Sequence, residues 1–175
     1  MVPIPNTKHE ISAGVVVYLR TKEGPRFLLL YHGGRYWNFP KGHLELIKAE
    51  GEDLPDVRET SFKAAVRETC EETGLQQKDL VFRRGFKAHE RYTFFKGKTR
   101  IIKTVIYYLA ETKERQIKIS EEHEGFGWFK YRDARNILSS YRENEAVLRR
   151  AYEIIAPVKK KTIEITSQSQ ESQSS

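Results

Sequence analysis

An α/β (α+β) fold, in which a mixed β-sheet lies between helices, is predicted by three features of this sequence. Short β-branched and aliphatic runs come first, a helical segment follows, and more strand-like runs precede a helical end. Hydrophobic residues make up 38% of the 175 residues and charged residues 31%, which is typical of a globular chain with one core. No apolar run approaches the ~20 residues that a membrane-spanning helix needs. Strands and helices in this order favour a mixed sheet with helices on its faces.

The first predicted elements are two strands that form a hairpin. Residues 11–20 (ISAGVVVYLR) and 25–32 (PRFLLLYH) are strand-like runs, and the turn-forming segment TKEGP joins them. Residues 35–43 (RYWNFPKGH) then indicate a strand end and a loop, because Pro and Gly interrupt an aromatic run. The charged segment 44–59, which contains a Gly and a Pro, predicts an irregular loop.

A helix is predicted next, from Thr60 or Ser61, either of which can cap the first turn, to Gly74, which suits a helix C-terminus. The glutamates of this segment lie roughly opposite its apolar stripe. The stripe comprises Phe62, Ala65, Val66 and Cys70. We therefore expect Cys70 to be a small core residue rather than a reactive thiol.

More strands are predicted after the helix. Residues 80–95 and 99–112 indicate two strands around the turn KGK. Residues 116–120 (QIKIS) and 125–131 (GFGWFKY) indicate two short strands that flank the segment EEHE. Together these runs supply the second part of the predicted sheet.

The chain is expected to end in a helical region and a tail. Residues 131–156 have a helical pattern with a break near Ser139 and Ser140. One domain is therefore expected over residues 1–156. The Ser- and Gln-rich tail 157–175 lacks the aromatic residues needed for folding, and we expect it to be disordered.

Charge and cysteine usage limit the partners and the compartment. The formal net charge of +7 favours an anionic partner such as a polyphosphate, a nucleotide or RNA, although solubility alone also accounts for it. The single cysteine cannot form an intrachain disulfide, which fits a reducing compartment. The first residues lack the basic and then apolar order of a secretory signal. We expect a cytoplasmic monomer that does not associate with membranes.

Three glutamates, Glu68, Glu71 and Glu72, converge on one side of the predicted helix. Side chains three and four positions apart share a helix face, and like charges there repel by a few tenths of a kcal/mol per pair. A bound cation would offset that repulsion. Magnesium binds carboxylate oxygens together with water and substrate phosphate, and such ions activate water for attack on phosphorus. A solvated acidic helix face is the alternative explanation for the same pattern.

The residues around these glutamates resemble the signature of the Nudix family. Gly42 of the segment PKGHLE precedes a spaced glutamate, Glu59, and the segment RETCEETGL (67–75) follows at the family's spacing. The distance from Gly42 to Glu59 is longer than in the family, so residues 46–58 are interpreted as an insertion. Gly51 is the competing choice for the signature glycine. The resemblance implies the Nudix fold.

A narrower resemblance is to the asymmetrical diadenosine tetraphosphate hydrolases. It rests on the segments PKGHLE, GFK, KTVIYYLAE and SEEHEGFGW, and runs from about Ile11 to the last helix. The resemblance implies hydrolysis of a phosphoanhydride by in-line attack of water, with diadenosine tetraphosphate split into ATP and AMP. It implies Mg²⁺ as cofactor, for which Mn²⁺ can substitute.

The resemblance also implies roles for the acidic residues. Glu72 and Glu68 would hold the metal, Glu71 would help to hold it or support the water, and Gly42 would add its carbonyl oxygen. Glu122 would lie close to the metal, with Glu121 and Glu124 as rivals. Glu68 or Glu122 would act as general base, and the sequence leaves this choice open. Arg67 would orient the carboxylate of Glu59.

Substrate contacts are implied by the same resemblance. Tyr92 and Phe126 would stack on adenine, although core packing is the alternative for both. Lys41 and Lys103 would face the phosphate chain, and a solvated lysine is the alternative for each. His43 would be a loop or phosphate contact rather than a metal ligand.

Three other functions use the same metal site or scaffold. An RNA 5′-pyrophosphohydrolase or decapping enzyme would use Arg83, Arg84 and the segment FFKGKTR as a track for the RNA. A diphosphoinositol polyphosphate phosphohydrolase would also need lysines. A nucleotide- or RNA-binding module without activity would not need the repelling glutamates.

Overall fold

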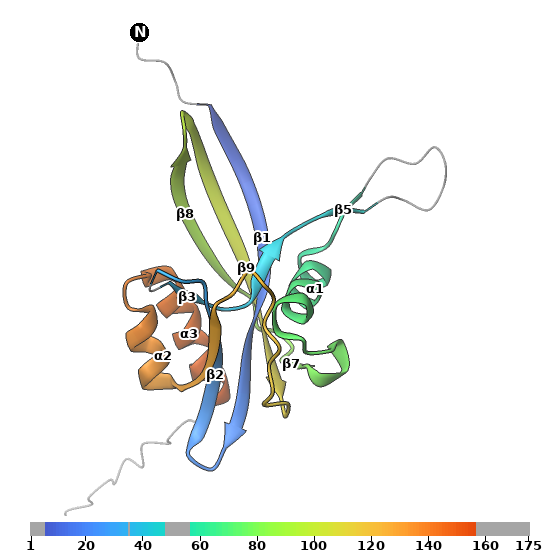
Figure 1. Ribbon diagram of the computed structural model, residues 1–175, viewed down its shortest axis with the longest axis vertical. Helices are drawn as coiled ribbons and strands as arrows, with labels where there is room; N and C mark the ends of the chain where they lie inside the picture. The colour runs from blue at the N-terminus through green and yellow to red at the C-terminus, as the bar shows by residue number, and fades with distance from the viewer. Residues whose placement is uncertain (1–5, 35, 48–56, 157–175) are drawn as a thin grey trace, which may run out of the picture.

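The computed structural model describes residues 6–34, 36–47 and 57–156. A sheet of eight strands separates α1 (Ser61–Thr73) from the pair α2 (Tyr131–Leu138) and α3 (Arg142–Ile155), as Figure 1 shows. This mixed sheet with helices on both faces confirms the predicted fold class. Within the described part of the chain, none of the helices has the length and apolar content that a bilayer crossing requires.

The sheet is built around two long neighbouring strands. The strand order is β10-β2-β1-β9-β7, with β3 beside β2, β4 beside β1 and β8 beside β9. β1 and β9 run parallel from the pair Thr7 and Arg100 to the pair Leu19 and Thr112, and the other pairings are antiparallel. The strands are β1 (Thr7–Thr21), β2 (Gly24–Tyr31), β3 (Trp37–Asn38), β4 (Lys41–His43), β7 (Val81–Phe82), β8 (Ala88–Lys96), β9 (Thr99–Thr112) and β10 (Gly125–Lys130).

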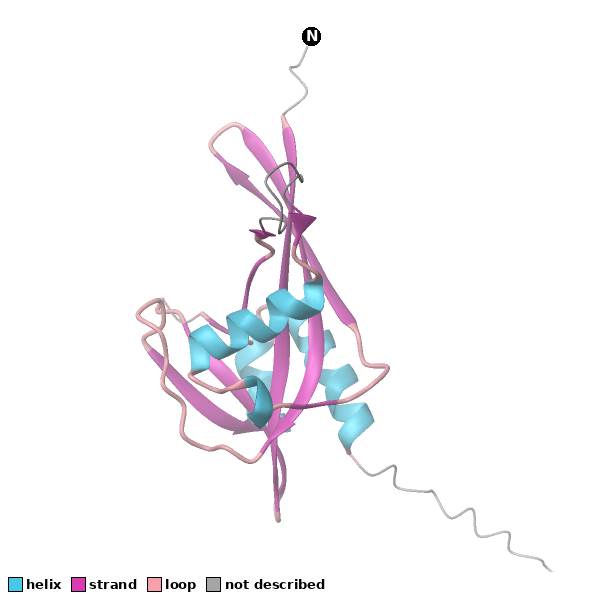
Figure 2. Cartoon of the chain, turned by 90° about the vertical axis from the view of Figure 1, so that its right-hand side faces the viewer, coloured by secondary structure: helices cyan, strands magenta, loops and turns pink. Residues whose placement is uncertain are grey.

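Alternate residues of β1 supply two hydrophobic cores, one on each face of the sheet. Val16 and Tyr18 pack in the core that includes α2 and α3, whereas Val15 and Val17 pack in the core that includes α1. This alternation follows from the two-residue period of a strand, whose successive side chains point to opposite faces. All four residues are fully buried, so β1 links the two helical layers, which lie in front of the strands and behind them in Figure 2.

The predicted helix boundaries are confirmed by the caps of α1. The Thr60 side chain accepts a hydrogen bond from the Lys63 amide at 3.3 Å. Gly74 ends the helix at a φ of 71°, where a side chain would be strained, and its amide bonds to the Cys70 carbonyl at 2.9 Å. The helix therefore begins and ends where these residue types require.

The predicted apolar stripe of α1 is partly wrong. Phe62 is 39% exposed and packs edge-on against Phe82 and Tyr108, and Cys70 is only half-buried. The helix is rotated relative to the prediction because Glu72 points inward, where it accepts a hydrogen bond from a backbone amide. The buried residues are Ala64, Ala65, Val66, Thr69, Glu72 and Thr73.

Residues 116–120 do not form the predicted strand. Their backbone bonds to the end of α1 instead of to a neighbouring strand. The Lys118 amide donates to the Thr73 carbonyl at 2.9 Å, and the Ser120 amide to the Glu72 carbonyl at 3.3 Å. Ile117 and Ile119 still pack against the core next to α1, which explains the alternating pattern that suggested a strand.

The hairpin and the helix break are confirmed, whereas two other predictions fall outside the described residues. β1 and β2 pair up to Thr21 and Gly24, and α2 ends at Leu138 before α3 begins at Arg142. The predicted insertion is described only at its ends, where β5 (Leu46–Ile47) pairs with β6 (Val57–Arg58). The alternative glycine Gly51 and the tail 157–175 lie outside the described residues.

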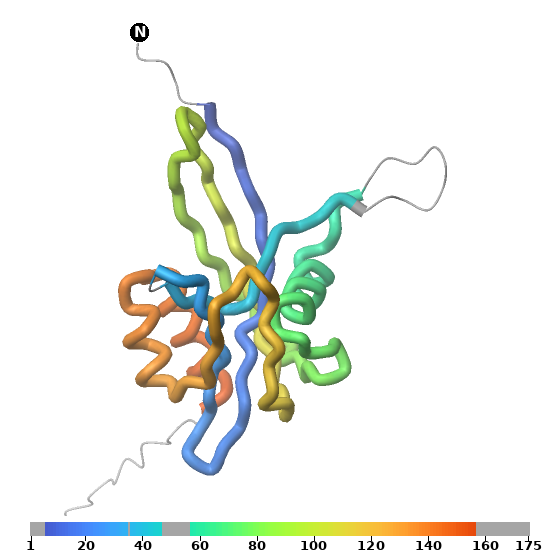
Figure 3. Tube along the Cα trace, in the orientation of Figure 1, coloured from blue at the N-terminus to red at the C-terminus, as the bar shows by residue number. Residues whose placement is uncertain are grey.

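Three strands project beyond the helices as an arm. It consists of residues 7–11 of β1 and residues 91–103 of β8, its turn and β9. Figure 3 shows this arm extending away from the body, with the three strands side by side. The arm begins where β4 leaves β1, which is also where the candidate site lies.

Candidate active site

Arg67 on α1 organises the acidic residues of the helix. Its guanidinium holds Glu59 through two hydrogen bonds, from Nε to Oε1 at 3.2 Å and from Nη2 to Oε2 at 3.0 Å. Nη1 donates to Glu68 at 2.9 Å and to Glu71 at 3.2 Å, and Nη2 donates to the His43 carbonyl at 2.9 Å. For Glu59, burial acts to raise the pKa, but the hydrogen bonds from Arg67 and from the Glu45 amide, together with the charges of Arg67 and Lys63, leave the pKa below its ordinary value.

Glu68 and Glu72 face a cavity of about 340 Å³ that we call the phosphate cavity. A side chain on Gly42 would collide with the Glu68 carboxyl group, whose atoms lie 1.9–2.2 Å from the position of an added Cβ. The absence of a side chain at Gly42 therefore makes room for Glu68. Glu72 is buried and accepts a hydrogen bond from the Lys41 amide at 2.9 Å. The cavity is lined by Ser12, His32, Lys41, Gly42, His43, Glu68, Glu72, Lys103 and Glu122.

Burial shifts the pKa of both cavity glutamates upward. It raises the pKa of Glu72 to about 7, against the opposing hydrogen bond from the Lys41 amide. It also raises the pKa of Glu68, against the opposing charge of Arg67. The ionised forms of both carboxylates are therefore costly without a positively charged ligand.

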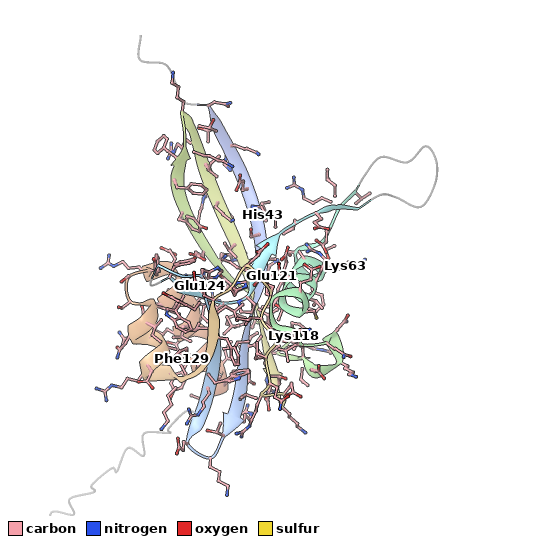
Figure 4. The ribbon with its side chains drawn as sticks, viewed as in Figure 1. His43, Lys63, Lys118, Glu121, Glu124 and Phe129 are labelled. Carbon is pink, nitrogen blue, oxygen red and sulfur yellow. The ribbon has the colours of Figure 1, made fainter. Side chains whose placement is uncertain are left out.

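Glu122 is the member of the segment EEHE that lines the phosphate cavity. Glu124 lies instead against Gly33, where an added Cβ would be 2.3 Å from its Oε1 atom. Glu121 is exposed and is absent from the lining. Figure 4 shows Glu121 and Glu124 in the loop before β10, below His43, which marks the base of the arm.

Two lysines place positive charge in the phosphate cavity. Lys103 on β9 is half-buried, and its pKa is lowered by burial and by the charge of Lys41. His43 is largely exposed, and its Nε2 atom lies 3.4 Å from both Lys103 Nζ and the Glu10 carboxylate. The cavity therefore combines carboxylates with cations, a set of groups suited to a metal-bound phosphate chain.

A second hollow, of about 580 Å³, adjoins the phosphate cavity, and we call it the aromatic cleft. Lys41 lines both hollows and so connects them. Tyr36 and Tyr141 meet edge-on with ring centroids 5.0 Å apart, although they come from opposite halves of the chain. The aromatic cleft is lined by Tyr36, Lys41, Glu90, Tyr92, Phe94, Tyr141, Arg142 and Glu143.

Two residues singled out from the sequence do not line either hollow. Phe126 is 39% exposed on β10, opposite Leu30, and is absent from the lining of the phosphate cavity and the aromatic cleft. Glu71 is exposed and bonds to Arg67 outside the phosphate cavity. The structure therefore brings together Lys41, Gly42, His43, Glu68, Glu72, Lys103 and Glu122, with Tyr92 next to them.

The profile of the NUDIX domain matches residues 8–153, and the matched region contains both hollows. The chain belongs to the NUDIX family. The asymmetrical bis(5′-nucleosyl)-tetraphosphatase of Rattus norvegicus is 33% identical over 133 residues, which cover 74% of this chain and 80% of that protein. The enzyme of the same name from Caenorhabditis elegans is 31% identical over 143 residues, which cover 79% of this chain and 91% of that protein.

Solved Nudix structures agree with the fold. The crystal structure of a C. elegans Ap4A hydrolase binary complex has a TM-score of 0.65 and 27% sequence identity, covering 84% of this chain and 98% of that chain. The E. coli dihydroneopterin triphosphate pyrophosphohydrolase has a TM-score of 0.55 and 22% identity, covering 83% of this chain and 94% of that chain, and supports the fold alone.

The donor atoms of this Nudix protein fit a divalent cation, although its carboxylates do not converge. Among the described residues, no three His, Cys, Asp or Glu side chains are already gathered as a ligand set. Arg67 bonds to Glu68, and the Lys41 amide bonds to Glu72, so both carboxylates are engaged inside the protein. The fit rests on the buried carboxylate of Glu72 and on Ser12 Oγ, a buried oxygen of the lining without a described hydrogen-bond partner.

Sequence reasoning missed several residues of the two hollows. Tyr36 follows a glycine pair and Tyr141 follows the predicted helix break, and neither belongs to the signature segments. The one available signal for Tyr141 was that an aromatic residue stands where a helix resumes after the predicted break. Ser12 and His32 lie in strand-like runs, and only the folded sheet brings them to the cavity.

Proposed function

We propose that this Nudix enzyme hydrolyses dinucleoside polyphosphates, with diadenosine tetraphosphate split into ATP and AMP. The observation that carries the proposal is the junction at Lys41, where a cavity lined by carboxylates and cations meets a cleft lined by aromatic rings. Such a pair of hollows suits a ligand in which a nucleobase is joined to a chain of phosphates. The relatives named as tetraphosphatases support the same substrate.

The reaction is an in-line displacement at a phosphorus atom next to one adenosine. The water oxygen forms a bond to that phosphorus, and the bridging P–O bond on its other side breaks. AMP takes the water oxygen, and ATP leaves with the bridging oxygen. The proton released by the water passes to a carboxylate, for which Glu68 and Glu122 are both candidates because both line the phosphate cavity.

The chain itself binds and orients the substrate. Lys41 and Lys103 balance the negative charge of the phosphates, and His43 contacts the chain at the exposed side of the cavity. Tyr92 stacks on adenine, with Tyr36 and Tyr141 as the other walls of the aromatic cleft. We propose that Phe126 contacts the second, more exposed adenosine, because Phe126 lies outside the aromatic cleft.

The acidic residues suit a divalent cofactor. Mg²⁺, or Mn²⁺ in its place, would be held by the carboxylates of Glu68, Glu72 and Glu122 and by the Gly42 carbonyl, with support from Glu71. The bound ion would polarise the phosphorus and lower the pKa of the attacking water. Arg67 donates hydrogen bonds directly to Glu59, Glu68 and Glu71, and these bonds limit the rotation of the three carboxylates. We also propose that the enzyme is cytoplasmic and that it is a monomer. Light scattering of the purified chain would test the monomeric state.

Product analysis in the presence of Mg²⁺ tests the proposal. We expect equal amounts of ATP and AMP from diadenosine tetraphosphate. We expect Glu72→Gln to lower kcat/KM by at least about 100-fold, the upper end of what loss of a supporting residue at a metal site costs. Two ADP molecules, or faster release of pyrophosphate from a 5′-triphosphate RNA, would contradict the assignment.

The neighbouring glutamates provide a matched control. Glu122→Gln and Glu121→Gln make the same change in the same loop, but only Glu122 lines the phosphate cavity. We expect a large loss of turnover for the first variant and wild-type turnover for the second. Equal losses would mean that the loop acts through its overall charge and that Glu122 has no specific role.

A further inference from the structure

The two faces of the arm differ in their relation to the site. In β8, the pairs Tyr92 with Lys103 and Phe94 with Ile101 lie on one side, and Arg91 and Phe95 point to the other. Tyr92 and Phe94 line the aromatic cleft, so their side of the arm continues the site, and we call it the cleft face. β1 adds Lys8 and Glu10 to this face, because they pair with Ile101 and Lys103.

The arm carries a strong excess of positive charge. Its described residues, 7–11 and 91–103, include Glu10 as the one acid, and Glu10 is engaged by His43 at 3.4 Å. The cations of these segments are Lys8, Arg91, Lys96, Lys98, Arg100 and Lys103. On the cleft face, Lys103 lies in the phosphate cavity, Lys8 lies further out, and Lys96 lies near the turn.

Two aromatic rings accompany these cations on the cleft face. Tyr92 and Phe94 have ring centroids 6.0 Å apart and planes inclined by 31°, so both rings present their faces in similar directions. Phe94 is 38% exposed although it is a large apolar residue. Tyr92 is half-buried and packs against the core at its base. Neighbouring aromatic rings beside cations are an arrangement on which proteins bind single-stranded nucleic acids, because every base can stack on an aromatic ring.

We infer that the cleft face of the arm binds single-stranded nucleic acid whose 5′ phosphate lies in the phosphate cavity. The first base would occupy the aromatic cleft, and the following nucleotides would pass Phe94 between Lys8 and Lys96 toward the turn. A duplex would not fit this arrangement, since its bases are stacked on each other and unavailable to the rings. The position of the 5′ end rests on the proposed function, whereas binding along the arm does not.

The opposite face of the same arm provides a matched control. Lys8→Gln with Lys96→Gln removes two cations from the cleft face, and Arg91→Gln with Arg100→Gln removes two from the other face. All four side chains are exposed, so neither pair removes a buried contact. Thermal unfolding of both double variants checks that the fold is retained.

The probe is an eight-nucleotide single strand with a 5′ monophosphate and a 3′ fluorescein, titrated with the full chain in EDTA and followed by fluorescence anisotropy. We expect the cleft-face variant to bind about 10-fold more weakly or worse at low salt. Its salt slope should fall by about 1.4, the value for two lost phosphate contacts on a single strand. The opposite-face variant should bind within about twofold of the wild type.

Several outcomes would overturn the inference. These are no binding by the wild type, equal losses in both variants, an unchanged cleft-face variant, or equally tight binding of the same sequence as a duplex. Hydrolysis of diadenosine tetraphosphate, measured in parallel, separates the two proposals, because both double variants should retain wild-type kcat/KM. Strand binding without any hydrolysis would refute the proposed function and leave the arm as a binding surface.

Discussion

Arg67 is the residue whose replacement tests the organisation of the site most directly. Its guanidinium makes five hydrogen bonds, to Glu59, Glu68, Glu71 and the His43 carbonyl. A lysine at this position keeps the charge but has a single ammonium group with three donors at one point. At least two of the five bonds must therefore be lost in Arg67→Lys. At about 1.5 kcal/mol for each bond to a charged partner, the loss is about 3 kcal/mol.

Two measurements test this reasoning. For a chain of this size, about 3 kcal/mol corresponds to a fall in Tm of about 6–12 °C, measured in EDTA so that no metal contributes. Since Arg67 also orients the carboxylates of the phosphate cavity, kcat/KM should fall about 10- to 100-fold. A Tm within about 2 °C of the wild type together with unchanged kcat/KM would refute the idea that the fork of donors matters.

Four further replacements give expected outcomes. Glu72→Gln should raise the Tm of the metal-free protein above pH 7 and leave it unchanged below about pH 4.5. Because the pKa of Glu72 is raised to about 7, ionisation of its side chain lowers the free energy of unfolding of the wild type by up to about 3 kcal/mol as the pH rises from about 4.5 to 7. A Tm difference between variant and wild type that does not change with pH would contradict this reasoning. Gly42→Ala should lower kcat/KM at least about 10-fold with a Tm change under about 3 °C, because the added Cβ displaces only the flexible end of Glu68; unchanged activity would argue against it. For Glu111, burial acts to raise the pKa, but hydrogen bonds from Tyr18, Arg20 and Arg83 hold it below its ordinary value, so Glu111→Gln should lower Tm at pH 7, and this difference should shrink as the pH falls through the lowered pKa, where the wild type loses the contribution; a difference that does not change with pH would contradict this. Tyr92→Ala should raise the KM for diadenosine tetraphosphate about 10-fold with a smaller change in kcat, and an unchanged KM would exclude stacking on this ring.

The signature helix could be predicted closely because its determinants are local. Thr60 and Gly74 act on the first and last turns through their own backbone geometry, and neither effect depends on the rest of the fold. The rotation of the helix was harder to predict. It depends on the bond between Glu72 and the Lys41 amide, a tertiary contact that an apolar stripe does not reveal.

The aromatic cleft could not be predicted from the sequence because its walls come from distant segments. Tyr36 precedes β3, Tyr92 lies on β8 and Tyr141 precedes α3. Only the packing of α3 against the sheet brings Tyr141 to Tyr36, with their rings 5.0 Å apart. The strand predicted over residues 116–120 failed for a related reason, since its alternating apolar residues pack on the core while its backbone bonds to α1.

The parallel pairing of β1 and β9 also dictates when the site is complete. The hydrogen bond of Tyr18 to Glu111 joins residues 93 positions apart, and a pairing between such distant segments forms slowly because a long loop must close first. During synthesis on the ribosome, α1 with Glu68 and Glu72 is made before Lys103 has been translated. A nascent chain therefore carries Lys41, Glu68 and Glu72 before it carries Lys103 and Glu122. The protein acquires a place for a phosphate chain only when β9 docks beside β1.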